Sequence, residues 1–205
     1  MPSLPSGQMS RVYGLTGGIA SGKTTVLDIF KKNGCKTYDA DQVARQVVVP
    51  GSVGLREITK QFSKHILSTD GSLDRKKLGR IVFSDRRQLR KLTGITGLLI
   101  RKQILKMISD MKKDPDPVIN IFEIPLLFEG KYQSYFDATI SIYLDPQIQL
   151  KRLMKRNNLD EVAAKKKIES QMSMDQKRLL ADFSIDNSQD LTHLETEILQ
   201  LLKKL

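Results

Sequence analysis

The feature that most constrains the fold of this chain is the stretch LTGGIASGKTTV, residues 15–26. Four residues separate Gly17 from Gly22, and Lys23 and Thr24 follow directly. This is the G-x-x-x-x-G-K-[ST] spacing, in which a backbone with few side chains lets successive N–H groups converge on phosphate oxygens. The spacing predicts a strand, a tight turn and the N-terminus of a helix, in that order.

The residues on either side of this loop fit that order. The apolar run RVYGLTG, residues 11–17, is typical of a buried strand. The run TTVLDIFKKNG, residues 24–34, is typical of a helix with Val26, Leu27 and Phe30 on its inner face and Gly34 as its stop. We therefore interpret the loop as a phosphate cradle. A glycine turn that only joins a strand to a helix is the alternative.

Short apolar runs alternate with helical patterns along the rest of the chain. Strands are expected at 35–41, 117–125, 138–146 and 182–187, and helices at 145–158, 159–180 and 191–205. Residues 42–114 are mostly helical in pattern, with breaks at VVPGS and STDGSL. Strands that alternate with helices predict an α/β fold with a parallel sheet, into which the helical middle is inserted as a cap.

The overall charge suggests polyanionic partners. Lys and Arg number 34 against 23 acidic residues, a formal net charge of +11. Residues 75–102 alone contain ten basic residues and one acid. Such a window is typical of a solvated helical face, of a pocket for nucleotide phosphates or of a nucleic-acid surface, and charge alone does not separate the three.

A cytoplasmic protein of one domain is expected. The single cysteine, Cys35, excludes an internal disulfide framework. No apolar run approaches the roughly 20 residues that a membrane helix needs. Residues 1–10 are polar and contain two prolines, so we interpret them as a flexible tail, with residues 11–205 as the domain.

Two aspartates follow the expected second strand, in the sequence DAD. In an extended segment Asp39 and Asp41 would face the same side, roughly 6.6 Å apart, at the carboxyl end of the strand where ligands bind in open α/β sheets. One carboxylate could then hold a Mg²⁺-bound water while the other accepts the proton of an attacking hydroxyl. The alternative for Asp41 alone is a cap on the helix that follows.

A basic helical run, QLKRLMKR, supplies candidate arginines. Arg152 and Arg156 lie one helical turn apart and hence on one face. Phosphoryl transfer spreads negative charge over the equatorial oxygens, which an arginine from a mobile segment can stabilise. A solvated helix face is the alternative for both side chains.

The motifs in their order resemble a known family. LTGGIASGKTTV, YDADQVARQVVVPGS, DGSLDRKKLGRIVFSD, IPLLFE, QLKRLMKRN and ADFSIDN are similar to dephospho-coenzyme A kinases over residues 12–187. The resemblance implies a P-loop kinase-like α/β/α fold of three layers, with a parallel five-stranded sheet, a helical substrate-binding region at 42–114 and a lid at 146–178. It also implies transfer of the γ-phosphoryl of ATP to the ribose 3′-hydroxyl of dephospho-CoA, with Mg²⁺, and no nucleic-acid or membrane partner.

The same resemblance implies roles for individual residues. Asp41 matches the proposed base, with Lys23 and Arg152 as the other catalytic residues, and Thr24 and Asp39 would hold the metal ion. ATP would be bound by Gly17, Gly18, Ala20, Ser21, Gly22, Lys23, Thr24, Thr25, Arg152 and, at the adenine end, Asn187. The acceptor would be bound by Asp39, Asp41, Arg45, Asp70, Gly71, Arg75, Pro125, Leu126, Leu127 and Glu129.

The chain departs from the family pattern at two places. Ala20 stands where a third loop glycine is usual, which is acceptable if its φ is negative. Gly97-Leu98 replaces the usual His-Pro. For the second departure, our hypothesis is that the basic window 75–102 attracts the pyrophosphate of the acceptor in place of the missing polar contact.

Other functions stay open on the sequence alone. A nucleoside or nucleotide kinase would share the loop, the aspartates and the lid. A nucleic-acid-binding protein would use the positive charge, although no groove-reading or aromatic single-strand motif is present. A GTPase or ATPase would carry a strand ending in a magnesium-binding Asp, whereas the strand pattern VINIFEIP ends in Glu123.

Overall fold

The computed structural model describes residues 10–115 and 118–205, so the predicted tail at 1–10 lies outside the described residues except for Ser10. The strands are β1 Arg11–Gly17, β2 Lys36–Asp39, β3 Ile119–Glu123, β4 Ala138–Tyr143 and β5 Phe183–Asp186. The α-helices are α1 Lys23–Lys32, α2 Ala40–Gln46, α3 Val53–Phe62, α4 Arg75–Ser84, α5 Arg86–Lys112, α6 Pro146–Asn157, α7 Glu161–Glu169, α8 Met174–Leu180 and α9 Leu191–Leu202.

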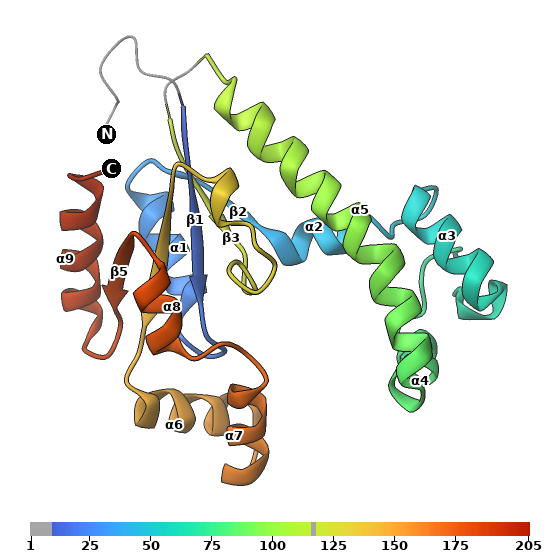
Figure 1. Ribbon diagram of the computed structural model, residues 1–205. Helices are drawn as coiled ribbons and strands as arrows, with labels where there is room; N and C mark the ends of the chain where they lie inside the picture. The colour runs from blue at the N-terminus through green and yellow to red at the C-terminus, as the bar shows by residue number, and fades with distance from the viewer. Residues whose placement is uncertain (1–9, 116–117) are drawn as a thin grey trace. The chain divides into compact units, whose positions relative to one another are not determined.

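The strands form one five-stranded sheet in the order β2-β3-β1-β4-β5 (Figure 1). Every pairing in it is parallel, which confirms the predicted sheet. In this order β1 is central, and the chain switches from β3 on one side of it to β4 on the other. Open parallel sheets bind their ligands at such a switch point, beyond the carboxyl ends of the strands.

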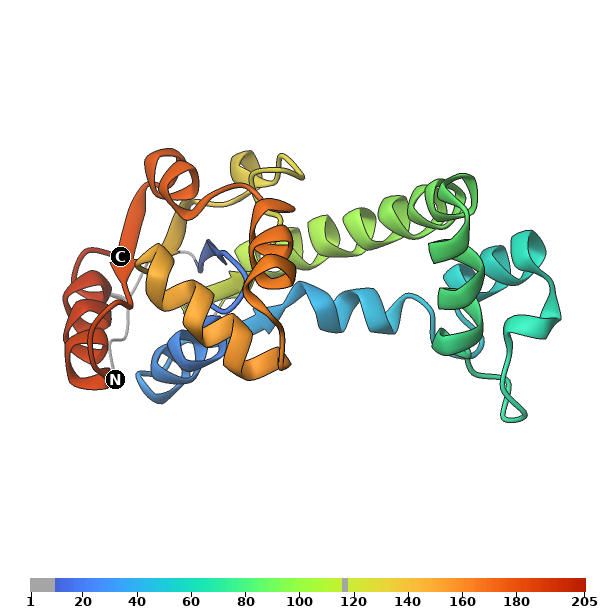
Figure 2. The ribbon, with the colours of Figure 1, turned by 90° about the horizontal axis from the view of Figure 1, so that it is seen from below.

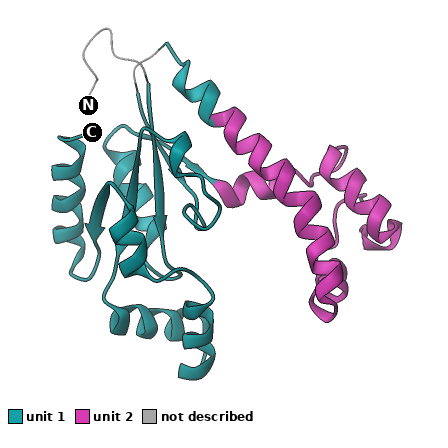
Figure 3. Ribbon diagram, viewed as in Figure 1, with its two compact units in different colours: residues 1–39, 108–205 teal, residues 40–107 magenta. Residues whose placement is uncertain are grey.

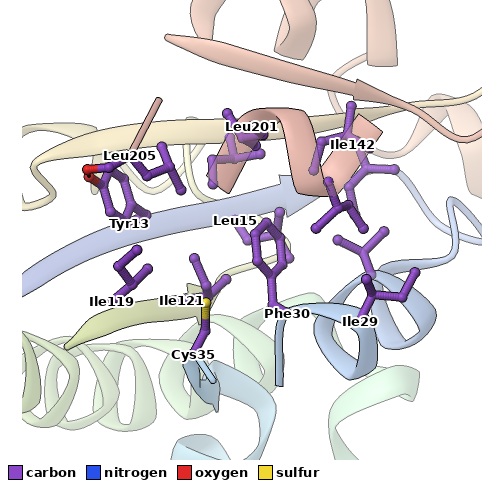
Figure 4. Packing of buried hydrophobic residues seen from close by; sticks show 14 of the residues in the cluster. Tyr13, Leu15, Ile29, Phe30, Cys35, Ile119, Ile121, Ile142, Leu201 and Leu205 are labelled. Carbon is purple, nitrogen blue, oxygen red and sulfur yellow. Dashed lines mark hydrogen bonds between the residues drawn. The ribbon is translucent and has the colours of Figure 1, made fainter. Parts of the chain in front are cut away.

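One face of the sheet is covered by α1 and α9. Tyr13, Leu15 and Ile121 of the strands pack with Phe30 of α1 and Leu201 of α9 (Figure 4). This agrees with the helical pattern of residues 24–34, whose apolar positions recur at helical spacing. The other face is contacted by α8, which lies against β4 and β1. The sheet therefore has helices on both faces, as the predicted α/β/α fold requires.

The chain divides into two compact units, coloured separately in Figure 3. Unit 1 comprises residues 1–39 and 108–205 and contains the sheet. Unit 2 comprises residues 40–107, is helical, and has its own apolar core. That core is formed by Val48, Ile58, Phe62, Ile66, Leu78 and Val82. Unit 2 thus corresponds to most of the helical segment predicted at 42–114.

Two boundaries differ from the expected ones. The second strand ends at Asp39 and α2 begins at Ala40, so the segment DAD is not extended throughout. The helical run predicted at 159–180 is two helices, because Ser173 starts α8 with a capping box in which its side chain accepts from Gln176 N–H. Within the described part of the chain, no helix combines the length and the apolar character needed to cross a membrane.

Candidate active site

The predicted phosphate loop lies between β1 and α1. β1 ends at Gly17, α1 begins at Lys23, and the turn between them is closed by a hydrogen bond from Ser21 N–H to Gly18 O at 3.2 Å. Gly22 has φ +88°, and a Cβ at this position would collide with the Asn187 amide nitrogen. Glycine is therefore required here both by the backbone conformation and by the space available.

Ala20 is also in the left-handed region, with φ +61°. The condition under which alanine would be tolerated without strain, a negative φ, is therefore not met. Because an L-residue with a Cβ costs about 1–2 kcal/mol in this conformation, the loop holds Ala20 in a strained state where a glycine would be relaxed.

Lys23 lies over the loop that precedes it. Its Nζ donates to the carbonyl oxygens of Gly17 at 3.1 Å and Gly18 at 3.2 Å, and it lies 3.9 Å from Glu123 Oε1. The side chains of Lys23 and Glu123 are only 15% and 11% exposed. A lysine held at this place, beside backbone N–H groups at a helix N-terminus, is poised to neutralise nucleotide phosphates.

Two carboxylates lie together at the carboxyl edge of the sheet. In the parallel register Asp39 at the end of β2 is paired with Glu123 at the end of β3, and Glu123 is paired with Leu15 of β1. Glu123 was not among the predicted site residues, because the strand of a GTPase or ATPase would end in an aspartate at this place. A buried strand that ends in any carboxylate next to the phosphate loop was the signal that could have found it.

Asp41 and Arg45 lie on α2, in unit 2. Both are exposed and are four residues apart, so they share a face of the helix. Asp41 is in the first turn of α2, whose start at Ala40 breaks the extended geometry expected between Asp39 and Asp41. The argument that both carboxylates face one side of a strand was therefore wrong, because the helix starts between them.

The segment DGSL forms a tight turn in unit 2. Gly71 has φ +77°, Asp70 Oδ1 accepts hydrogen bonds from Ser72 N–H at 3.0 Å and Ser72 Oγ at 2.7 Å, and these bonds lower the pKa of Asp70. Arg75 is the first residue of α4. It lines an apolar cavity of about 280 Å³, together with Ala44, Val48, Ile58, Leu78 and Phe83, among others.

The segment from Pro125 to Glu129 was predicted to bind the acceptor, but several of its residues contact other parts of the protein. Leu127 is fully buried, whereas Leu126 is 49% exposed. Glu129 forms an ion pair with Lys177 of α8, with Nζ 2.9 Å from Oε1, and the Lys177 side chain is 0% exposed. Lys177 Nζ also donates to Pro125 O at 2.8 Å. Burial lowers the pKa of Lys177, and the hydrogen bond and charge of Glu129 oppose that shift.

Arg152 and Arg156 have different surroundings although both lie on α6. Arg152 is partly buried, and its Nη2 donates to Asn187 O at 3.4 Å. Arg156 is exposed, and its Nε donates to Asn157 Oδ1 at 2.9 Å. Asn187, at the end of β5, donates from Nδ2 to Ser21 O at 2.8 Å. Arg152 and Asn187 are therefore the two residues of this group that reach the phosphate loop.

This arrangement defines the class of the protein. A strand, a glycine loop with a lysine over it and a helix stand at the switch point of a parallel sheet, and an arginine from another helix reaches the loop. These are the parts of a P-loop kinase.

Comparison with known proteins identifies the family. The family model for dephospho-CoA kinase matches residues 11–193, and the chain belongs to this family. It is 39% identical to the dephospho-CoA kinase of Listeria monocytogenes over 96% of this chain and 98% of that protein. Members of the family phosphorylate dephospho-CoA with ATP in the final step of coenzyme A biosynthesis.

Solved structures agree with this assignment. A dephospho-CoA kinase from Campylobacter jejuni superposes with a TM-score of 0.75 at 31% identity, covering 96% of this chain and 97% of that one. A shikimate kinase from Bacteroides thetaiotaomicron has a TM-score of 0.52 at 16% identity, over 96% of this chain and 98% of that one, and shares the fold alone.

Proposed function

We propose that this protein transfers the γ-phosphoryl group of ATP to the ribose 3′-hydroxyl of dephospho-CoA, producing coenzyme A and ADP in the cytoplasm. The observation that carries the proposal is the position of Lys23, whose ammonium lies on the carbonyls of Gly17 and Gly18 at the mouth of the loop. Family membership supports dephospho-CoA as the acceptor.

In this proposal, residues of the loop and of α6 have different roles toward ATP. Backbone N–H groups from Ala20 to Thr25 surround the phosphates at the N-terminus of α1, and Lys23 neutralises the β- and γ-phosphates. Arg152 adds charge to the equatorial oxygens as the transferred group leaves, which stabilises the transition state more than the ground state. Asn187 supports the loop through Ser21 O, in addition to its proposed place near the adenine.

Hard oxygen donors are present for a magnesium ion. Among the residues that the structure describes, no group of three or more His, Cys, Asp or Glu could hold a metal. Mg²⁺ bound with a nucleotide commonly takes only one or two protein oxygens, the rest coming from phosphates and water, so the hydroxyl of Thr24 and the carboxylate of Asp39 fit that need. When bound, the ion would neutralise charge on the phosphate oxygens.

We assign acceptor-binding residues within each unit separately: Asp41, Arg45 and Arg75 in unit 2, and the segment after β3 in unit 1. Asp41 is the proposed general base, which takes the proton of the 3′-hydroxyl as it attacks the γ-phosphorus. Arg45 shares its helix face, and Arg75 lies beside an apolar cavity of the same unit. A phosphate-binding cation beside an apolar wall suits an acceptor that carries both a pyrophosphate and an extended, mostly uncharged arm.

An assay of ADP release across a panel of acceptors tests the proposal. Dephospho-CoA should support rapid release, whereas nucleosides, nucleoside monophosphates and water should support little. Preference for a nucleoside would make the protein a nucleoside kinase and refute the assignment.

The variant Asp41→Asn tests the base separately. We expect it to keep ATP affinity and lose most of kcat, because the amide has the shape of the carboxylate but takes no proton. Equal loss of ATP affinity would instead make Asp41 a metal ligand.

A further inference from the structure

The phosphate loop is held at one residue, Ile19, by two glutamines from distant parts of the chain. Gln171 Oε1 accepts a hydrogen bond from Ile19 N–H at 2.9 Å, and Gln149 Nε2 donates to Ile19 O at 2.9 Å. Both hydrogen-bonding groups of one loop residue are thus satisfied by side chains that lie more than a hundred positions further along the chain. No part of the proposed phosphate chemistry uses either glutamine.

The two glutamines lie near opposite ends of the helical pair α6–α7, within the segment predicted as the lid at 146–178. Gln149 is in the first turns of α6 and is 4% exposed, and Gln171 follows α7. The helices α6 and α7 contact each other (Figure 2). The backbone of Ile19 is therefore hydrogen-bonded by a side chain where the chain enters this helical pair and by another where it leaves.

The exit of the lid is itself anchored to the body of unit 1. Glu129 Oε1 accepts from Met172 N–H at 3.1 Å, and the same carboxylate pairs with the buried ammonium of Lys177. Lys177 reaches β1 as well, with Nζ 3.4 Å from Thr16 Oγ1. Gln171 thus precedes a segment fixed on both the strand and the loop after β3, which gives its side chain a defined position.

Ile19 directly follows the two residues whose carbonyls contact the Lys23 ammonium. The lysine of such a loop reaches the β- and γ-phosphates, and here Lys23 Nζ lies on the carbonyls of Gly17 and Gly18, next to Ile19. The other end of the loop, at the N-terminus of α1, is held separately by Asn187 through Ser21 O.

We propose that Gln149 and Gln171 are positioning residues, which clamp the backbone of Ile19 from the two ends of the α6–α7 helical pair and so align the γ-phosphate for transfer. The proposal rests on the proposed function only in that the loop binds ATP. It predicts that removing the clamp weakens the binding of ATP while that of ADP, which has no γ-phosphate, is retained.

The test uses Gln171→Met and Gln149→Met, which keep side-chain length and remove the hydrogen bond. Gln147→Met is the matched control, because Gln147 is exposed on the same helix as Gln149. Equilibrium binding of Mg·ATP and Mg·ADP is measured without acceptor, so the result does not depend on which acceptor the enzyme uses. We expect the Kd for ATP to rise about two- to tenfold in each clamp variant, the size of one hydrogen bond, and the Kd for ADP to change less than twofold.

Amide exchange of Ile19 gives a second readout in the nucleotide-free protein. With isoleucine labelled for NMR, exchange at Ile19 N–H should accelerate in Gln171→Met and stay slow in Gln171→Glu, because a carboxylate oxygen still accepts the bond. Gln147→Met should leave it unchanged.

Three results would overturn the proposal: equal loss of ATP and ADP affinity, Ile19 exchange in Gln171→Met as slow as in the unmodified protein, or a control variant that behaves like the clamp variants. Failure of the clamp would leave dephospho-CoA turnover by the unmodified protein intact, and failure of the proposed acceptor would leave the two nucleotide affinities measurable.

Discussion

The buried pair between Lys177 and Glu129 offers the sharpest test of the structure. Lys177 Nζ lies 2.9 Å from Glu129 Oε1, with side-chain exposures of 0% and 25%. Removing one partner of a buried pair costs about 3–5 kcal/mol. For Glu129→Gln two features reduce this cost: Glu129 is one quarter exposed, and Lys177 keeps its bond to Pro125 O at 2.8 Å. We therefore expect a loss of about 2 kcal/mol in the free energy of unfolding.

The loss should depend on pH in a defined direction. Burial lowers the pKa of Lys177 in the folded protein, and Glu129 opposes the shift, so Glu129→Gln lowers that pKa further. Between the folded-state pKa and the ordinary value of 10.5, the unfolded chain binds more protons than the folded protein, and stability rises with pH. This pH range, in which stability rises, begins at a lower pH in the variant than in the unmodified protein. The stability that the variant loses relative to the unmodified protein should therefore shrink as the pH is raised from neutral towards 10.5.

Urea unfolding followed by circular dichroism at several pH values from 7 to 10 measures both effects. In thermal unfolding of a chain of 205 residues, a loss of about 2 kcal/mol would lower Tm by roughly 4–8 °C. Glu169→Gln is the control, since Glu169 is exposed on α7, and it should change stability by less than about 0.5 kcal/mol. A Glu129→Gln deficit no larger than that of the control, or one that grows with pH, would refute this account of the pair.

Three further predictions follow from the loop, the lid and the basic window. Arg152→Ala should lower kcat about 10- to 1000-fold in steady-state assays, whereas Arg156→Ala should stay within about threefold, because only Arg152 reaches Asn187 beside the loop. In urea unfolding, Ala20→Gly should leave stability within about 1 kcal/mol, since relief of a left-handed φ offsets the glycine's extra chain entropy, and Ala20→Val should lose about 1–2 kcal/mol. If residues 75–102 attract the acceptor's pyrophosphate, KM for dephospho-CoA should rise more steeply with salt than KM for ATP, and parallel rises would exclude the hypothesis.

Much of the fold could be predicted because its signals are local. The G-x-x-x-x-G-K-T spacing lies between a strand pattern and a helix pattern, and both elements form where expected, as β1 and α1. The parallel sheet was predicted from strands that alternate with helices. The boundary at Asp39 and Ala40 was missed, because a short strand and the first turn of a helix share the same few polar residues.

The surroundings of the candidate site were harder to predict for a physical reason. A lysine in the run MDQKRLL is expected to be exposed, since lysine is almost never fully buried unless it is paired. Lys177 can be buried because it pairs with Glu129, which lies 48 positions earlier in the sequence. Glu129 itself was assigned to the acceptor because its motif was known, and no local pattern shows that its carboxylate is already engaged by α8.

Residues that bind the phosphates and residues that support the phosphate loop differ in how they are distributed along the sequence. The phosphate-binding backbone and Lys23 occupy one continuous stretch, because successive N–H groups and a lysine must converge on a single group of oxygens. The side chains that support this stretch are under no such constraint. They need only reach it in space, and Gln149, Gln171 and Asn187 do so across separations of 130, 152 and 166 residues. Each is a polar residue in a polar segment, so no local sequence pattern distinguishes it from its exposed neighbours.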